Sequence, residues 1–165
     1  MKSLLSRFAI LPICTLLIIT SCSSSNNECT FEPNLTVNQT QLAADIAAID
    51  AFLAENNITA QIDPSGLRFV ITEEGDGANA DFCSDVSVTF VGTLLNGQIF
   101  DASDRPTTFN LRELIVGWQI GIPLVRSGGS ITLYIPSVYA FGASPVPGIP
   151  VNSSLIFEID VIGVD

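Results

Sequence analysis

The chain has 165 residues, enough for one ordinary domain with short appendages. It carries 17 acidic and 6 basic residues, a formal net charge of −11 at pH 7, which argues against a nucleic-acid partner. Histidine is absent, which excludes Ser-His-Asp and Cys-His catalysis and nearly all transition-metal sites. The sequence also lacks Rossmann and P-loop glycine patterns, so we expect neither a cofactor nor a metal.

Residues 1–21 have the features of a secretory signal, with two basic residues before an apolar run from Phe8 to Thr20. The run is shorter than the roughly 20 residues that a membrane-spanning helix needs. It leads into Ser21 and Cys22, which resembles a bacterial lipobox, where the cysteine is lipidated and begins the mature protein. An ordinary cleaved signal with a chance cysteine is the alternative. The polar stretch directly after Cys22 favours the lipoprotein.

Cleavage before Cys22 leaves four arginines and no lysine against 17 acids, a net charge of −13. Such a chain is repelled by anionic lipid surfaces, so lipid rather than electrostatics must hold it at a membrane. We therefore predict a protein of the bacterial cell envelope, lipid-anchored at the outer membrane on its periplasmic or surface side.

Residues 22–62 are predicted to form a polar tether followed by one helix. Asn38 is a plausible N-cap with Gln41 three residues later, and Asn56-Asn57 can end the helix in a left-handed turn. The apolar residues recur at helical spacing, at Leu42, Ile46, Ile49 and Leu53. This stripe must be buried, either on the chain's own domain or in a dimer. A dimerising helix needs more heptads, so we predict a monomer.

Residues 63–165 read as alternating strands and turns. Strands are predicted at 67–72, 86–90, 130–135 and 154–164, with a return strand from Ile99. Asn96-Gly97 predicts a two-residue hairpin turn. A short apolar helix is predicted over 111–119. The fold class is α+β, a twisted antiparallel sheet with one short helix packed across it.

Two loops stand out. The acidic loop 73–77 lacks the ligand spacing of a calcium site. Residues 136–150 are rich in proline and glycine, and a loop of that length without secondary structure is usually functional.

Of four cysteines, Cys14 leaves with the signal and Cys22 takes lipid, which leaves Cys29 and Cys83. Disulfides persist in an oxidising compartment, so we predict that these two are paired. Two free buried thiols are the alternative.

Several motifs, in this order, resemble an FKBP-type prolyl isomerase domain from about Gly66 to Val164. The first half is carried by Val88-Thr89-Phe90-Val91-Gly92, Asn96-Gly97-Gln98-Ile99-Phe100-Asp101 and Phe109. The helix is carried by Glu113-Leu114-Ile115-Val116-Gly117-Trp118-Gln119-Ile120-Gly121. The second half is carried by Ile135-Pro136, Tyr139-Ala140-Phe141-Gly142 and Ile149-Pro150-Val151-Asn152-Ser153-Ser154-Leu155-Ile156-Phe157.

The resemblance implies a five- or six-stranded sheet wrapped around a short helix, with a shallow apolar pocket for a proline ring. Trp118 would be the pocket floor, and the Ile115 N–H would hold a substrate carbonyl. Asp101 would lie at the rim, and Tyr139 and Phe141 on the loop above. The implied walls and further binding residues are Phe90, Phe100, Phe109, Leu114, Ile115, Ile149 and Phe157.

The family usually has tyrosine where this chain has Phe90 and Phe141. The hydroxyl at Phe90 would bond the Asp101 carboxylate, and the one at Phe141 would help to bind the substrate carbonyl. Each lost neutral hydrogen bond is worth roughly 0.5–1.5 kcal/mol, so we expect reduced rather than abolished activity.

The resemblance implies a peptidyl-prolyl cis-trans isomerase that assists the folding of exported proteins, with proline-containing polypeptides as clients. Without the motif order, the same aromatics would be interpreted as ordinary core. A binding module with little turnover, and a structural subunit of an envelope complex, are the alternatives.

Overall fold

The computed structural model describes residues 29–165, and both the predicted signal and the lipidation site at Cys22 lie outside the described residues. The elements are α1 (Gln39–Glu55), β1 (Gln61–Ile62), β2 (Arg68–Glu73), β3 (Asp85–Leu94), β4 (Ile99–Asn110), η1 (Leu111–Glu113), α2 (Val116–Gly121), η2 (Ile122–Leu124), β5 (Ser130–Ile135), η3 (Ser137–Tyr139) and β6 (Leu155–Val164). Over residues 29–165, no helix is long and apolar enough to cross a membrane.

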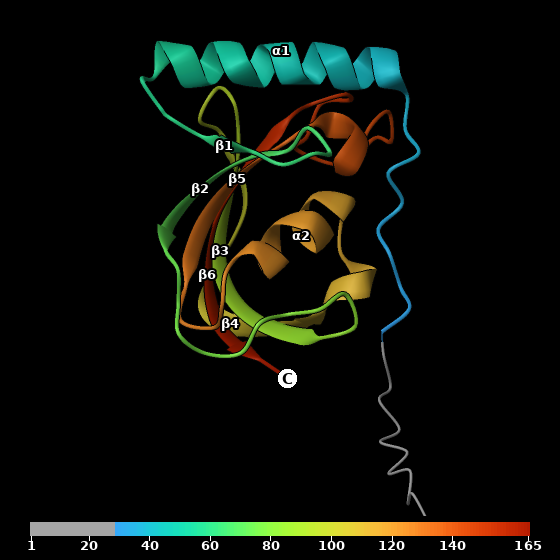
Figure 1. Ribbon diagram of the computed structural model, residues 1–165. Coiled ribbons are helices and arrows are strands. Elements are labelled where there is room, and N and C mark those ends of the chain that lie inside the picture. The colour runs from blue at the N-terminus through green and yellow to red at the C-terminus, as the bar shows by residue number, and fades with distance from the viewer. Residues whose placement is uncertain (1–28) are drawn as a thin grey trace, which may run out of the picture.

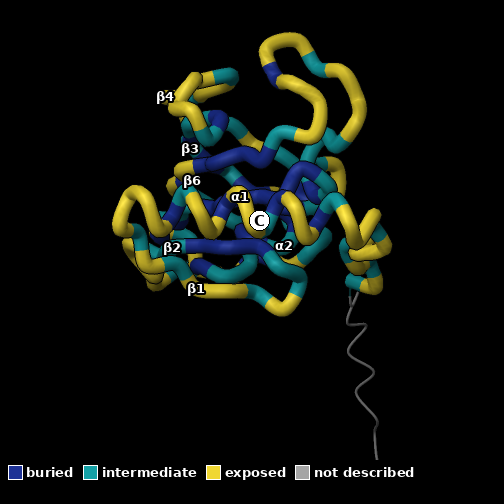
Figure 2. The backbone as a smooth tube through the Cα atoms, turned by 90° about the horizontal axis from the view of Figure 1, so that it is seen from above, coloured by how far each residue is buried: buried dark blue, intermediate teal, exposed yellow. Residues whose placement is uncertain are grey.

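The strands form one antiparallel sheet of six, in the order β1-β2-β5-β6-β3-β4. The predicted α+β class is confirmed, with six strands rather than five. Every second residue of β3 is buried, which is the pattern of a sheet with one face on the core. The sheet curves around α2 (Figure 1), and the buried stretches gather in the middle while exposed loops surround them (Figure 2).

Helix α2 lies close to the sheet because two of its residues lack side chains. A Cβ at Gly117 would collide with the side chain of Ile135, and one at Gly121 with that of Leu133. Ile135 and Leu133 belong to β5 and are fully buried. This close approach determines the position of Trp118, which follows Gly117 in α2, above the inner face of the sheet.

Helix α1 crosses one end of the sheet (Figure 1) and begins as predicted, because the Asn38 side chain accepts hydrogen bonds from the N–H groups of Thr40 and Gln41. Asn57 adopts the predicted left-handed conformation at φ 55°. Of the predicted stripe, Leu42, Ile49 and Leu53 are buried and Ile46 is half-buried. The stripe packs on the chain's own domain, which was the favoured of the two expectations.

Three local predictions are wrong. The hairpin loop has three residues, since Leu94 pairs with Gln98 and only Gly97 has a positive φ, the form of a type I turn with a bulge. The predicted helix over 111–119 is two pieces, η1 and α2, because Leu114 and Ile115 are extended. The loop over 136–150 contains η3 and a bridge between Val146 and Ile149.

Candidate functional site

An apolar cavity of about 150 Å³ opens between the inner face of the sheet and α2. Its lining comes from six parts of the chain that the topology brings together. It consists of Phe90 on β3, Asp101 and Phe109 on β4, Leu114 and Ile115 between η1 and α2, Trp118 on α2, Phe141 after η3, and Phe157 on β6. No lining side chain carries a hydroxyl, and Asp101 is the only one with a charge.

Trp118 is held between phenylalanine rings at the cavity. The rings of Phe90, Phe109 and Phe157 lie 5.2, 6.2 and 5.1 Å from the indole, centroid to centroid, at 82–89°. Such edge-to-face contacts are the favoured geometry for aromatic pairs. Trp118 is 4% exposed, and its Nε1–H has no hydrogen-bond partner among the described residues. The floor is therefore set before any ligand enters.

The break between η1 and α2 leaves the backbone at Ile115 outside regular helix, at the cavity wall. Ile115 is extended, its carbonyl accepts from the N–H groups of Trp118 and Gln119, and its own N–H donates to no acceptor among residues 29–165. The buried Gln119 side chain holds the break open by donating to the carbonyls of Arg112 and Leu114, at 3.0 and 2.9 Å. The sequence alone did not indicate that Gln119 supports the site. Its position in the helix motif does not show that its side-chain amide reaches back to the carbonyls of Arg112 and Leu114.

Asp101 is both exposed and part of the cavity lining, which is the position of a rim residue. Its Oδ1 accepts from the Ala102 N–H at 2.9 Å, and the residue is exposed. Phe90 contributes only ring carbon beside it. An exposed carboxylate at the edge of an apolar cavity can attract the positive end of a peptide dipole without needing a proton.

Three predicted site residues do not line the cavity. Phe100 packs over Gly92, which has no side chain to obstruct it, and lies edge-on to Phe157 at 5.4 Å. Tyr139 is 2% exposed, and its hydroxyl donates to the Ser65 carbonyl at 3.0 Å. Ile149 is buried in the core. All three belong to, or pack against, the same hydrophobic cluster as the lining residues Phe90, Trp118 and Phe157.

Larger hollows of about 350, 340 and 290 Å³ lie elsewhere on the described surface. The first is lined mainly by hydroxyls and carboxylates on the outer face of the sheet, among them Ser130, Glu158 and Asp160. Ser130 and Thr89 already donate to the Asp160 carboxylate. The smaller cavity has apolar side chains at every lining position except Asp101, and apolar ligand surface is stabilised by such surroundings.

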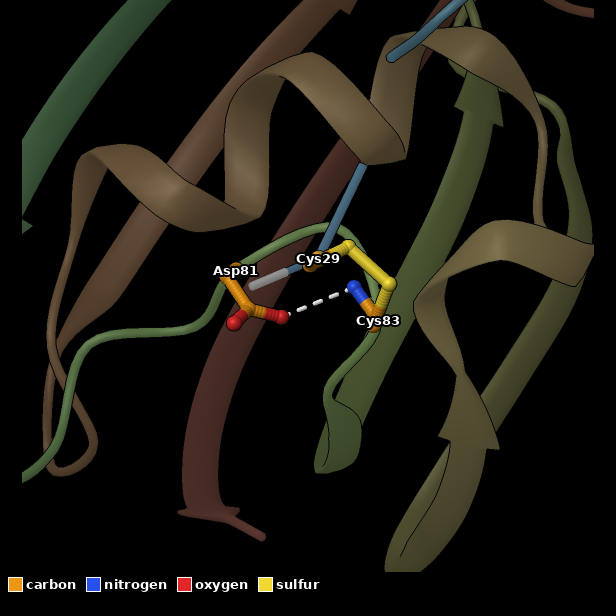
Figure 3. Close-up of side chains that lie close together, drawn as sticks. All are labelled: Cys29, Asp81 and Cys83. Carbon is orange, nitrogen blue, oxygen red and sulfur yellow. Dashed lines mark hydrogen bonds between the residues drawn. A yellow bond between two sulfur atoms is a disulfide. The ribbon is translucent and has the colours of Figure 1, made fainter. Parts of the chain in front are cut away.

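Cys29 and Cys83 are joined by a disulfide, with Cα atoms 5.8 Å apart (Figure 3). Asp81 lies beside them and accepts from the Cys83 N–H at 2.8 Å. These three residues have the composition of a metal site. The disulfide consumes both thiolates, so the group serves as a covalent fastening of residue 29 to the loop before β3.

The sequence matches known proteins over the part of the chain that builds this cavity. Residues 78–162 match the FKBP-type peptidyl-prolyl cis-trans isomerase family. The chain belongs to this family. The FKBP domain is 38% identical over 103 residues to FkpA from Escherichia coli, with 61% of this chain and 38% of that protein covered. It is 36% identical over 121 residues to the outer membrane protein MIP from Legionella longbeachae, with 70% and 52% covered.

Solved structures of proteins named as a prolyl isomerase or an FKBP are similar to this chain as well. A peptidyl-prolyl cis-trans isomerase from Pseudomonas syringae matches with a TM-score of 0.66 and 31% identity, covering 74% of this chain and 95% of that one. AtFKBP13 matches with a TM-score of 0.60 and 34% identity, covering 65% and 99%. The chain spans about two fifths of the length of the FkpA relatives it matches.

Proposed function

We propose that this protein is a peptidyl-prolyl cis-trans isomerase that acts on X–Pro bonds of exported polypeptides. The observation that carries the proposal is the cavity itself: aromatic rings around the Trp118 indole, one unused backbone N–H at Ile115, and one carboxylate at Asp101. Membership of the FKBP family supports the assignment.

Isomerisation of an X–Pro bond requires no side chain to act as an acid, a base or a nucleophile. The barrier to rotation about a peptide bond, about 18–20 kcal/mol, arises from amide resonance. The planar amide is more dipolar than the twisted one, so an apolar aromatic site favours the twisted form relative to water. Uncatalysed exchange takes tens to hundreds of seconds, and lowering the barrier requires no proton transfer and no covalent step.

Five of the lining residues have distinct roles in this proposal. Trp118 carries the proline ring, and Phe109 and Phe157 enclose it. The Ile115 N–H holds the carbonyl that follows the proline, which keeps the substrate chain in one place while the bond before the proline rotates. Asp101 polarises the twisting amide from the rim. The disulfide, the buried residues Tyr139 and Ile149, and Phe100 packed against the core keep the surrounding structure in place.

Phe90 and Phe141 limit the activity. Both line the cavity with rings that lack the tyrosine hydroxyl usual in the family. One neutral hydrogen bond is worth roughly 0.5–1.5 kcal/mol, so the loss at Phe141 reduces the rate by about tenfold or less.

The location proposed for the protein is the cell envelope. A lipid on Cys22 anchors the mature chain at the outer membrane, residues 22–62 supply the tether and helix, and residues 63–165 form the isomerase domain. The sequence pattern at Cys22 supports this, and a relative named as an outer membrane protein is consistent with it. Proline-containing polypeptides crossing the envelope are the clients, and the protein acts as a monomer.

The decisive experiment is an isomerisation assay with X–Pro peptides, with Trp118 fluorescence recorded on the same samples. Trp118 is the only tryptophan, so a change in its emission reports occupancy of the cavity. Binding together with faster cis-trans exchange supports the isomerase. Neither binding nor exchange, with the fold intact, overturns it.

The second candidate is a binding module that holds a proline-containing partner without much turnover. The absence of any hydroxyl among the lining side chains favours it, because the apolar pocket remains while a hydrogen-bond donor is lost. Binding without faster exchange would select this function.

A further inference from the structure

A buried hydrogen bond links helix α1 to the loop that carries Phe141. The Asp45 carboxylate on α1 accepts a hydrogen bond of 2.6 Å from the Ser137 hydroxyl. Asp45 is 4% exposed and Ser137 is fully buried. The other carboxylate oxygen accepts from the Gln41 side chain at 2.8 Å. The two linked residues are 92 positions apart in the chain.

Ser137 is the point from which the pocket loop is held. Its carbonyl accepts from the N–H groups of Ala140 and Gly142, at 3.0 and 2.8 Å. Ala140 and Gly142 are the two neighbours of Phe141, which lines the cavity. Ser137 is held at its hydroxyl by α1, and its own carbonyl in turn holds the backbone N–H groups of the two residues on either side of Phe141.

A second contact runs in parallel. The Tyr139 hydroxyl donates to the Ser65 carbonyl in the turn between β1 and β2. This contact and the Asp45 link both hold η3, but only the Asp45 link comes from α1. Family membership is shown from residue 78 onward, so α1 lies outside the matched segment.

The free-energy cost of burying the Asp45 carboxylate indicates a positioning role. A buried carboxylate is expensive unless it is fully hydrogen-bonded, and both of its partners here are neutral. Alanine or leucine would pack a helix against a domain without that cost. Hydrogen bonds to a charged acceptor are shorter and roughly twice as strong as neutral ones, which suits a carboxylate that must hold a hydroxyl in one place.

We infer that Asp45 is a positioning residue for the proline cavity: through Ser137 it holds the loop that places Phe141, so that the N-terminal helix sets the affinity for X–Pro segments. The inference rests on the proposed function for the identity of the ligand. When only a fraction of molecules has the loop in place, the dissociation constant rises by the inverse of that fraction. The bound complex has the loop in place in every case, so KM rises while kcat is preserved.

The test compares variants of the purified full-length protein. Asp45→Ala removes the acceptor, and Ser137→Ala removes the donor from the other side. Asp45→Asn keeps one oxygen that can accept from the Ser137 hydroxyl. Its new NH2 group can donate to the side-chain oxygen of Gln41. Asp50→Ala is the matched control, because it removes another α1 carboxylate, one that binds Arg68 at 2.9 Å and does not bond to η3.

Two measurements decide the matter: KM and kcat for X–Pro peptides, and amide hydrogen exchange at Ala140 and Gly142. Asp45→Ala and Ser137→Ala are expected to raise KM and to speed exchange at both amides by about tenfold, the scale of one buried hydrogen bond. Asp45→Asn should remain close to the parent. Asp50→Ala should leave KM and both amides unchanged even where its unfolding midpoint falls.

Unchanged exchange at Ala140 and Gly142 in Asp45→Ala overturns the inference, as does an equal effect in Asp50→Ala. A fall in kcat without a rise in KM overturns it too. If the parent neither binds nor isomerises X–Pro peptides, the proposed function is wrong, whereas exchange at the two amides still decides whether Asp45 holds the loop.

Discussion

The ring of Phe90 stands edge-on to the Trp118 indole, with centroids 5.2 Å apart and planes at 82°. Phe90 also meets Phe109 and Phe157, at 6.4 and 6.0 Å. Phe90 is 9% exposed and lines the cavity, so one side chain belongs to both the core and the candidate site. The cavity floor is consequently as rigid as the core beneath it.

Phe90→Ala should therefore destabilise the whole domain. Truncation of a buried aromatic costs about 3–5 kcal/mol, because it removes apolar contact and leaves a cavity. Urea unfolding followed by Trp118 emission measures the loss. Phe31→Ala is the control, since Phe31 is half-buried and has one aromatic contact, to Phe82 at 6.5 Å. Equal losses in the two variants would contradict the dual role of Phe90.

The two tyrosines should ionise at unusually high pH. Burial raises the pKa of Tyr134 above 10.0, and the negative charge of Glu158 adds a smaller increase. Burial also raises the pKa of Tyr139 above 10.0, with a smaller increase from the charge of Asp63. A raised folded-state pKa means that stability is fully present below about pH 10, the unfolded value, and is lost as the pH rises through the folded pKa.

Tyrosinate absorbance measures this directly, because the chain has only two tyrosines. The native protein should titrate above the denatured protein, and its unfolding midpoint should fall over the same alkaline range. Tyr134→Phe and Tyr139→Phe should each remove half of the native signal. Coincident native and denatured titration curves would show that neither phenol is buried in solution.

The disulfide should stabilise the fold mainly by restricting the unfolded chain. Cys29 and Cys83 are 54 positions apart, and closing a loop of that length is worth up to about 4 kcal/mol. The double variant Cys29→Ser with Cys83→Ser should lose stability on that scale in urea unfolding. Reduction of the parent should give the same midpoint as the double variant. Two titratable thiols in the unreduced, denatured mature protein would contradict the pairing.

Sequence patterns predicted the sheet well because successive side chains of a strand point to opposite faces. Where one face packs on the core and the other meets solvent, apolar and polar residues alternate along the strand. In β6, Leu155, Phe157, Ile159 and Val161 were predicted to share one face, and all four are buried. Strand β1 was missed, since two exposed residues carry no periodicity. The hairpin at Gly97 was located, but its loop length depends on backbone angles that an Asn-Gly pair does not fix.

The site was only partly predictable. The order of the motifs indicated Trp118 and Phe109, which line the cavity, and also Tyr139, which does not line it, because motif position does not show where a ring packs. The Gln119 and Asp45 contacts were also missed. Both are side-chain hydrogen bonds that form only after distant segments meet, and neither produces a repeating pattern in the sequence.

Anchoring is tested at Cys22. If this residue carries lipid, Cys22→Ser should move the protein from the membrane fraction to the soluble periplasmic or culture fraction. The net charge of −13 in the mature chain gives no electrostatic route back to an anionic surface. Continued sedimentation of the variant with membranes after a salt wash would contradict the lipoprotein assignment.

Phe141→Tyr should raise the isomerase activity. The substitution adds one hydroxyl to a ring that already lines the cavity, and Phe141 is half-buried, so the hydroxyl can reach solvent or substrate without strain. A neutral hydrogen bond to the substrate carbonyl is worth roughly 0.5–1.5 kcal/mol, which corresponds to a gain in kcat/KM of up to about tenfold. Exchange of X–Pro peptides measured on both proteins tests it.

Phe109→Tyr is the matched control, because it places the same group elsewhere on the cavity wall. The gain should be specific to position 141. An equal gain at 109 would show that any added hydroxyl is sufficient. An unchanged rate at 141 in an active enzyme would mean that the loop after η3 carries its side chain away from the substrate carbonyl during turnover.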